Sequence, residues 1–122
     1  MCWRICVVTG SRAEYGLLQP VISMLCDDPR FDLQLVVTGM HLSSEFGSTV
    51  NVIENDGFAI AERVESLVSG DTPVAIAKSM ALGLIGFADV YKRMQPDWVL
   101  VLGDRFEIYA AAQAAMLAAI PI

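Results

Sequence analysis

The sequence predicts an α/β fold in which helices cover a Rossmann-like parallel sheet. Short segments rich in apolar and β-branched residues alternate with longer segments whose apolar residues recur at helical spacing. The run 99–102 (Val-Leu-Val-Leu) is apolar without interruption, which is typical of a strand covered on both faces. The resulting order, β-α-β-(α)-β-α-β-α-(β), calls for parallel strands joined by right-handed crossovers.

The first strand and helix are expected at the start of the chain. Residues 3–9 (Trp-Arg-Ile-Cys-Val-Val-Thr) favour a strand because they are rich in β-branched residues. Ser11 and Glu14 then have the spacing of a helix capping box. An interior Pro20 loses a hydrogen bond and clashes one turn back. The helix therefore either starts late, near Leu18, or starts near Ala13 and kinks around Gly16. We favour the kinked helix.

The later elements follow from turn and capping signals. Gly83 and Gly86 lie inside the longest predicted helix and indicate close packing against a neighbour, because each weakens a helix by roughly 1 kcal/mol relative to alanine. That helix is expected to have Asp71 as its cap and Pro73 in its first turn. The predicted ranges are a strand at 31–38, a short helix around 49–55, a strand at 58–64, a helix to about 93, a strand at 98–102 and a helix from 106.

Composition sets limits on domain number and function class. The chain has 122 residues, 55% of them hydrophobic, which fits at most one domain with ample core material. A net charge of -6 argues against nonspecific nucleic-acid binding. Three cysteines without metal-ligand spacing, Cys2, Cys6 and Cys26, are expected to be reduced, buried thiols of a cytoplasmic protein. No metal, cofactor, signal peptide or membrane span is expected, and residues 118–122 suggest a helix running into another strand, so we expect residues 1–122 to be a partial N-terminal domain.

Charged residues follow the fourth predicted strand at the sheet edge where open α/β folds bind ligands. These are Asp104, Arg105 and Glu107. Asp104 and Glu107 have capping-box spacing, which is a structural explanation. Arg105 does not fit that explanation, because a cation in a first turn opposes the helix dipole. A bound anion would remove the conflict, and both interpretations remain open.

Two further loops leave strands at this edge. In the first, Gly10 would let a ligand approach the backbone, and the helix N-terminus with Arg12 would suit a phosphate. The alternative is a capped helix with a solvated Arg12. In the second, His41 is the only histidine, and a lone loop histidine is more often solvated than catalytic.

Three segments stand in the order and spacing of one family. They are 8–16 (Val-Thr-Gly-Ser-Arg-Ala-Glu-Tyr-Gly), 37–42 (Val-Thr-Gly-Met-His-Leu) and 103–107 (Gly-Asp-Arg-Phe-Glu). With them the chain resembles the N-terminal part of the hydrolysing UDP-N-acetylglucosamine 2-epimerases of sialic-acid biosynthesis. The resemblance covers essentially the whole chain and implies the N-terminal half of a two-domain, glycosyltransferase-B-like fold, with UDP-sugar between the halves.

The resemblance also implies a reaction and residue roles. Water and UDP-N-acetylglucosamine would give UDP and N-acetylmannosamine, through elimination of UDP and addition of water to a glycal. Arg12 and Gly16 match nucleotide-contacting positions, Asp104 matches a catalytic carboxylate and Arg105 a nucleotide-contacting arginine. Gly10 and His41 lie in matching motifs and are further substrate-binding candidates. The family's other catalytic groups would lie beyond Ile122, so the chain alone is expected to be inactive, and the full-length protein is expected to form a homo-oligomer.

Three alternatives remain open at this stage. The substrate could be UDP-N,N'-diacetylbacillosamine in the same reaction. The chain could instead belong to a noncatalytic nucleotide-sugar-binding domain, or to a glycosyltransferase with the same architecture. Release of free UDP without an acceptor sugar would distinguish an epimerase from the other two.

Overall fold

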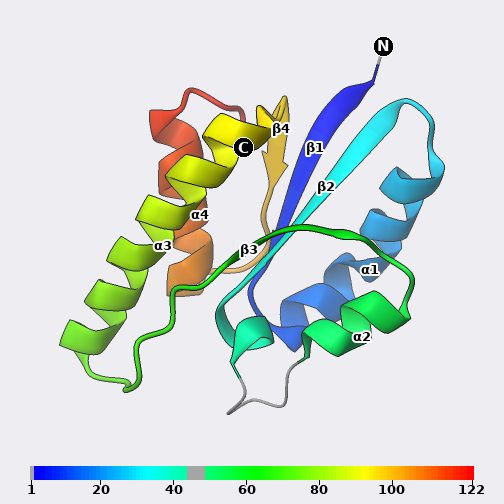
Figure 1. Cartoon of the computed structure of the whole chain (residues 1–122). Coiled ribbons are helices and arrows are strands. Elements are labelled where there is room, and N and C mark those ends of the chain that lie inside the picture. Colours follow the sequence, from blue (N-terminus) through cyan, green and yellow to red (C-terminus); the bar gives the residue numbers. More distant parts are fainter. Residues whose placement is uncertain (1, 44–48) are drawn as a thin grey trace.

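The fold is built on a four-stranded sheet with helices on both faces (Figure 1). The computed structural model describes residues 2–43 and 49–122. The strand order is β3-β2-β1-β4, and every pairing is parallel. Helices α1 and α2 cover one face of the sheet, and α3 and α4 cover the other (Figure 1). The predicted Rossmann-like parallel sheet is therefore confirmed.

The two central strands have the predicted boundaries, and the two outer strands are shorter than predicted. β1 spans Trp3–Thr9 and pairs with β2, Phe31–Thr38, over its full length. β3, Ile60–Val64, begins two residues after the predicted start, and its register with β2 shifts between Leu35 and Val36. β4, Trp98–Leu100, pairs only with residues 5–7 of β1. The chain beyond β4 leaves the sheet to form the loop at Gly103.

Helix α1, Arg12–Asp27, begins where the capping box predicts. The backbone N–H of Glu14 donates to Ser11 Oγ at 3.4 Å, and the helix continues through Pro20. The short helices are η1, Gly39–Leu42, and α2, Val50–Asn55.

The prediction that the cysteines are buried is correct for Cys6 and wrong for Cys2 and Cys26. Cys6 lies in the sheet core, whereas the other two side chains are exposed near the ends of β1 and α1. All three are free thiols.

Two predicted helix caps are wrong. In α3, Pro73–Met94, the cap is Thr72, whose Oγ1 accepts from the N–H of Ala75 at 3.1 Å. Pro73 takes the first helical position, so the residue directly before it, not Asp71, is the cap. In α4, Phe106–Leu117, the N-cap position falls on Arg105 and no side chain caps the helix. The helix thus begins one residue too late for Asp104 to cap it.

Two hydrophobic cores lie on opposite faces of the sheet. Tyr15, Leu18 and Ile22 of α1 pack on one face, and Phe87 and Tyr91 of α3 pack with α4 on the other. Close packing at the two α3 glycines is confirmed. A Cβ atom at Gly83 would lie 3.3 Å from the Ala110 Cβ, and one at Gly86 would lie 2.6 Å from a methyl group of Val64.

Helix α3 has the length and apolar composition of a membrane-crossing helix. Among residues 2–43 and 49–122 it is the one helix that meets this criterion, with a mean hydropathy of 1.5. A core helix of a globular domain can meet the same criterion. The buried residues Gly83, Phe87, Val90 and Tyr91 pack α3 against α4 and the sheet, which accounts for part of its apolar character.

Candidate functional site

The loops after β1, β2 and β4 meet at the carboxyl edge of the sheet, as predicted from the parallel topology. The N–H of Met40 donates to the carbonyl of Gly10 at 2.9 Å, which joins the first two loops. Gly39 has a φ of 61° and Gly103 a φ of 96°, backbone conformations that favour glycine. Each of the three strands ends at this edge in a short loop that leads into the next helix.

Two buried carboxylates lie beneath these loops. Glu14 of α1 is 7% exposed, and its Oε1 accepts from the N–H of Gly10 at 2.9 Å. Glu107 of α4 is 1% exposed, and its Oε1 accepts from Arg105 Nε at 2.6 Å. The Oε2 atoms of both residues are buried and have no hydrogen-bond partner within the described part of the chain. The sequence marked both residues through their capping spacing, but it did not place them together.

The pKa of Glu14 is subject to opposing influences. Burial raises the pKa of Glu14 above its usual value, while the hydrogen bond from Gly10 lowers it. The charge on Glu107 raises the same pKa, and the charge on Arg105 lowers it. The resulting pKa of Glu14 is raised, so this carboxyl group binds a proton more readily than an exposed glutamate does.

Side chains of the protein fill the space beside Gly10, and its predicted contact with substrate stays a prediction. The Gly10 N–H is already bonded to Glu14. A Cβ atom at Gly10 would lie 2.7 Å from Glu107 Cγ, so a side chain of this protein fills the space that the glycine leaves. The sequence pattern could not reveal this packing, because Glu107 comes from α4.

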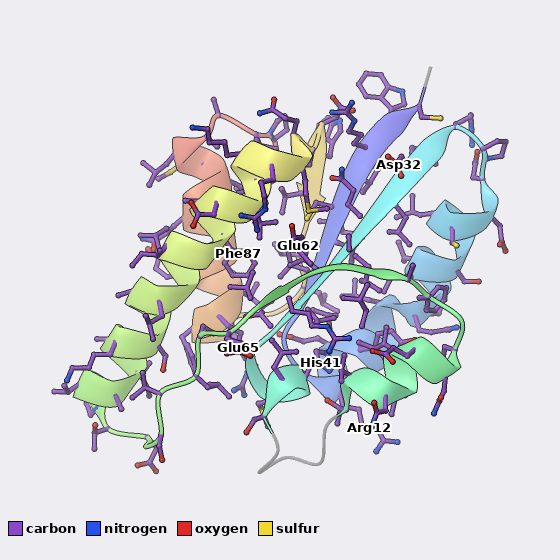
Figure 2. All side chains as sticks on the ribbon, viewed as in Figure 1. Arg12, Asp32, His41, Glu62, Glu65 and Phe87 are labelled. Carbon is purple, nitrogen blue, oxygen red and sulfur yellow. The ribbon has the colours of Figure 1, made fainter. Side chains whose placement is uncertain are left out.

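Arg12 and Gly16 are exposed on the first turns of α1. The Arg12 side chain extends away from the sheet (Figure 2), and it makes no hydrogen bond or ion pair with residues that the structure describes. No heavy atom lies within 4 Å of the position that a Cβ atom would take at Gly16. Both positions are open, and their predicted contact with a nucleotide stays a prediction.

Asp104 and Arg105 differ in their surroundings. Asp104 is exposed and follows the turn at Gly103. The Arg105 side chain is 40% exposed and is anchored at Nε by Glu107. The Arg105 guanidinium carbon lies 5.8 Å from the centre of the Phe106 ring. Of the six predicted site residues, only Arg105 lines the pocket described next.

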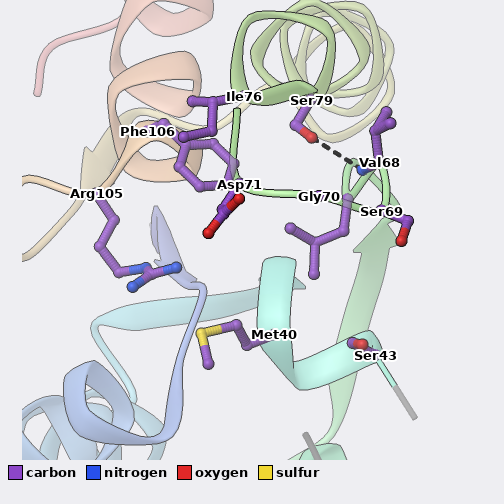
Figure 3. Close-up of a pocket in the computed structure, with 11 residues that line it drawn as sticks. Met40, Ser43, Val68, Ser69, Gly70, Asp71, Ile76, Ser79, Arg105 and Phe106 are labelled. Carbon is purple, nitrogen blue, oxygen red and sulfur yellow. Dashed lines mark hydrogen bonds between the residues drawn. The ribbon is translucent and has the colours of Figure 1, made fainter. Parts of the chain in front are cut away.

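A pocket of about 690 Å³ opens beside Arg105 (Figure 3). It lies between η1, the loop that follows β3, and the first turns of α3 and α4. Arg105 and Asp71 point into it, and Met40, Ile76 and Phe106 supply apolar walls (Figure 3). Apart from Arg105, sequence reasoning missed this pocket, because its walls come from four separate segments. The remaining lining residues are Ser43, Leu67, Val68, Ser69, Gly70 and Ser79.

His41 is neither solvated nor in the pocket. Its ring is 0% exposed, with Nε2 2.9 Å from Thr9 Oγ1 and Nδ1 2.8 Å from Thr49 Oγ1. Burial lowers the pKa of His41 to about 4, so the ring is neutral at pH 7. A neutral imidazole has one donor and one acceptor, and the two hydroxyl groups satisfy both. In this structure His41 therefore connects β1, η1 and the start of α2, and its predicted contact with substrate stays a prediction.

Comparison with known proteins agrees with the motifs. The family model described as UDP-N-acetylglucosamine 2-epimerase matches residues 23–122. The polysialic acid biosynthesis protein P7 of Escherichia coli is 40% identical over 98% of this chain and 30% of its own length. The hydrolysing UDP-N,N'-diacetylbacillosamine 2-epimerase of Legionella pneumophila is 41% identical over all of this chain and 32% of its own length.

Solved structures share the fold of this chain. The UDP-GlcNAc 2-epimerase of Neisseria meningitidis, solved bound to UDP-GlcNAc, superposes with a TM-score of 0.80 at 21% identity over 97% of this chain and 30% of that one. This likeness confirms the fold that the resemblance implies, the N-terminal half of a glycosyltransferase-B-like architecture. The chain spans about 30% of the length of the curated relatives that it matches. The match to the family model over 100 of the 122 residues shows that the chain belongs to the UDP-N-acetylglucosamine 2-epimerase family.

Proposed function

We propose that the full-length protein is a hydrolysing 2-epimerase that converts UDP-N-acetylglucosamine and water to UDP and N-acetylmannosamine. One observation carries this proposal beyond family membership. An exposed carboxylate, Asp104, directly precedes a cation, Arg105, that is anchored at the wall of a pocket. A proton-transfer group beside a cation is the pair of functions that elimination of a diphosphate requires.

The reaction divides into two steps. In the first, a base removes the proton from carbon two of the sugar while the bond between carbon one and the diphosphate oxygen breaks, which gives a glycal and UDP. In the second, water adds its oxygen to carbon one, and a proton returns to carbon two from the opposite face. We assign proton transfer to Asp104 and stabilisation of the departing diphosphate to Arg105 and Arg12. Gly16 leaves the surface next to Arg12 open for the nucleotide.

The chain supplies only part of this site. We propose that residues 1–122 are part of the N-terminal Rossmann-like domain, and that a second domain completes the UDP-sugar cleft. The further catalytic groups would lie on the rest of the protein, so these residues alone would be inactive. We also propose a cytoplasmic homo-oligomer that uses no cofactor and no metal. The name of the Escherichia coli relative supports a role in forming sialic-acid-type sugars.

A second substrate is favoured by a specific observation. The Legionella relative is named for UDP-N,N'-diacetylbacillosamine. That sugar carries one more acetamido group than UDP-N-acetylglucosamine, and the pocket beside Arg105 combines apolar walls with Asp71 as a hydrogen-bond acceptor. An acetamido group has a methyl group for the walls and an N–H for the carboxylate. The specificity constants of the full-length protein for the two nucleotide sugars would decide which one is preferred.

The decisive experiment uses the full-length protein in D₂O without an acceptor sugar. An epimerase should release UDP and place one deuterium at carbon two of the product, because the proton added in the second step comes from solvent. A glycosyltransferase or a noncatalytic binding domain should release no UDP under these conditions. Product without deuterium at carbon two would contradict the elimination and addition steps.

A further inference from the structure

We propose that Glu14 and Glu107 are positioning residues, a buried acid pair that holds the Gly103–Arg105 loop in place for the reaction proposed above, on which this inference rests. The pair stands out because no other carboxylates in the described part of the chain are both buried and left with an unpartnered oxygen. An unpartnered buried polar atom is costly, so its retention calls for an explanation.

The two acids contact the loops that follow β1, β2 and β4. Glu14 bonds to the N–H of Gly10, and its Oε2 would lie 3.0 Å from a Cβ atom at Gly103. Glu107 packs against Gly10 and Gly39, where Cβ atoms would lie 2.7 Å from its Cγ and 3.1 Å from its Oε1. The acids therefore touch all three glycine turns, and they fix the spacing between the β1 loop and the loop that carries Asp104.

Glu107 also sets the direction of Arg105. Its Oε1 accepts from Nε of the guanidinium at 2.6 Å, and this hydrogen bond leaves the two terminal nitrogens of Arg105 available at the pocket. The Glu107 side chain is fully buried, whereas that of Arg105 is 40% exposed. A buried carboxylate that bonds an arginine at Nε holds the guanidinium plane in one orientation. Arg105 would thus meet an anion with little further loss of side-chain freedom.

Among the described residues, the acid pair has fewer cations beside it than carboxyl groups. One cation, Arg105, faces two buried carboxylates, and the nearby ring of His41 is neutral and bonded to hydroxyl groups. Two ionised carboxylates with one cation would leave an uncompensated buried charge. Glu107 bonds the guanidinium of Arg105 directly, whereas the Glu14 carboxyl group bonds the backbone N–H of Gly10 and has a raised pKa.

The first test is a double-mutant cycle in the full-length enzyme, with Glu107→Gln, Arg105→Ala and both together. If Glu107 acts through Arg105, Glu107→Gln should raise KM about tenfold in the parent enzyme and have little further effect in the Arg105→Ala background. Independent effects of the two substitutions on KM would overturn the proposal. The matched control is Asp89→Asn, which removes an exposed carboxylate from α3 and should leave KM unchanged.

The second test examines the positioning role of Glu14. Glu14→Gln should retain most of the kcat that Glu14→Ala loses, because the amide oxygen can still accept from the N–H of Gly10 and the side chain keeps its volume. An equal loss of kcat in both variants would overturn the positioning role of Glu14. If the parent enzyme releases no UDP, the proposed function fails, but the Glu107–Arg105 cycle can still be measured by urea unfolding. Additive unfolding free energies in that experiment would overturn the pairing itself.

Discussion

Substitution of Asp104 by asparagine separates catalysis from stability. Asp104 is exposed, is not the cap of α4 and makes no hydrogen bond within the described residues. Its replacement should therefore change the free energy of unfolding by no more than about 0.5 kcal/mol, as surface substitutions usually do. The amide cannot transfer a proton, so kcat should fall by about 10²–10⁴-fold. That loss corresponds to about 3–5 kcal/mol in the activation barrier.

The assay combines UDP release by the full-length enzyme with thermal unfolding of the same preparations. We expect the melting temperature to stay within about a degree of the parent value, because the expected stability change is so small. Retained turnover in Asp104→Asn would refute the catalytic role of this carboxylate. A loss of stability as large as the loss of activity would refute the reasoning from exposure and from the position of the helix cap.

Three further predictions follow from the site and the caps. Arg12→Ala in the full-length enzyme should raise KM roughly tenfold or more, because a charge-assisted hydrogen bond contributes roughly 1.5–3 kcal/mol; unchanged KM would show that Arg12 is only solvated. The pKa of His41 is lowered from 6.5 to about 4, because the folded protein favours the neutral ring. The neutral ring therefore adds about 3 kcal/mol to the free energy of unfolding above pH 6.5, and this stabilisation is lost as the pH falls toward 4. His41→Gln should abolish this part of the pH dependence in urea unfolding. Thr72→Ala should cost about 1 kcal/mol in unfolding free energy and Asp71→Ala much less, and the reverse order would contradict the observed cap.

The sequence was sufficient to predict the bounds of those elements whose signals lie within a single segment. β1 and β2 are buried along their carboxyl-terminal halves, and the local residue pattern with its flanking turn signals placed both their ends correctly. The cap of α1 was also found, because Ser11 and Glu14 lie three residues apart. The parallel topology also predicted correctly that the glycine turns after β1, β2 and β4 lie at the same edge of the sheet. In each of these cases, the information lies within one segment or in the order of segments.

Features that depend on contacts between segments could not be predicted. The start of α4 depends on the turn at Gly103, which contacts Glu14 of α1. The burial of His41 depends on hydroxyl groups from Thr9 and Thr49, which a local pattern does not bring together. The acid pair also required the fold, because its members stand at the starts of two helices on opposite faces of the sheet. The capping-box spacing drew attention to Glu14 and Glu107 separately, but it did not indicate that the two acids lie close together.

The position of Arg105 has a consequence for how substrate preference can change. Its guanidinium separates two regions, with buried acids on one side and the pocket walls on the other. Leu67 and Ile76 line the pocket but belong to neither the acid pair nor the glycine turns. Under the proposed function, substitutions at these two positions would reshape the space for a sugar substituent and leave Asp104, the proposed proton-transfer residue, in place. Members of one family can in this way diverge in the sugar they accept without rebuilding the chemistry they share.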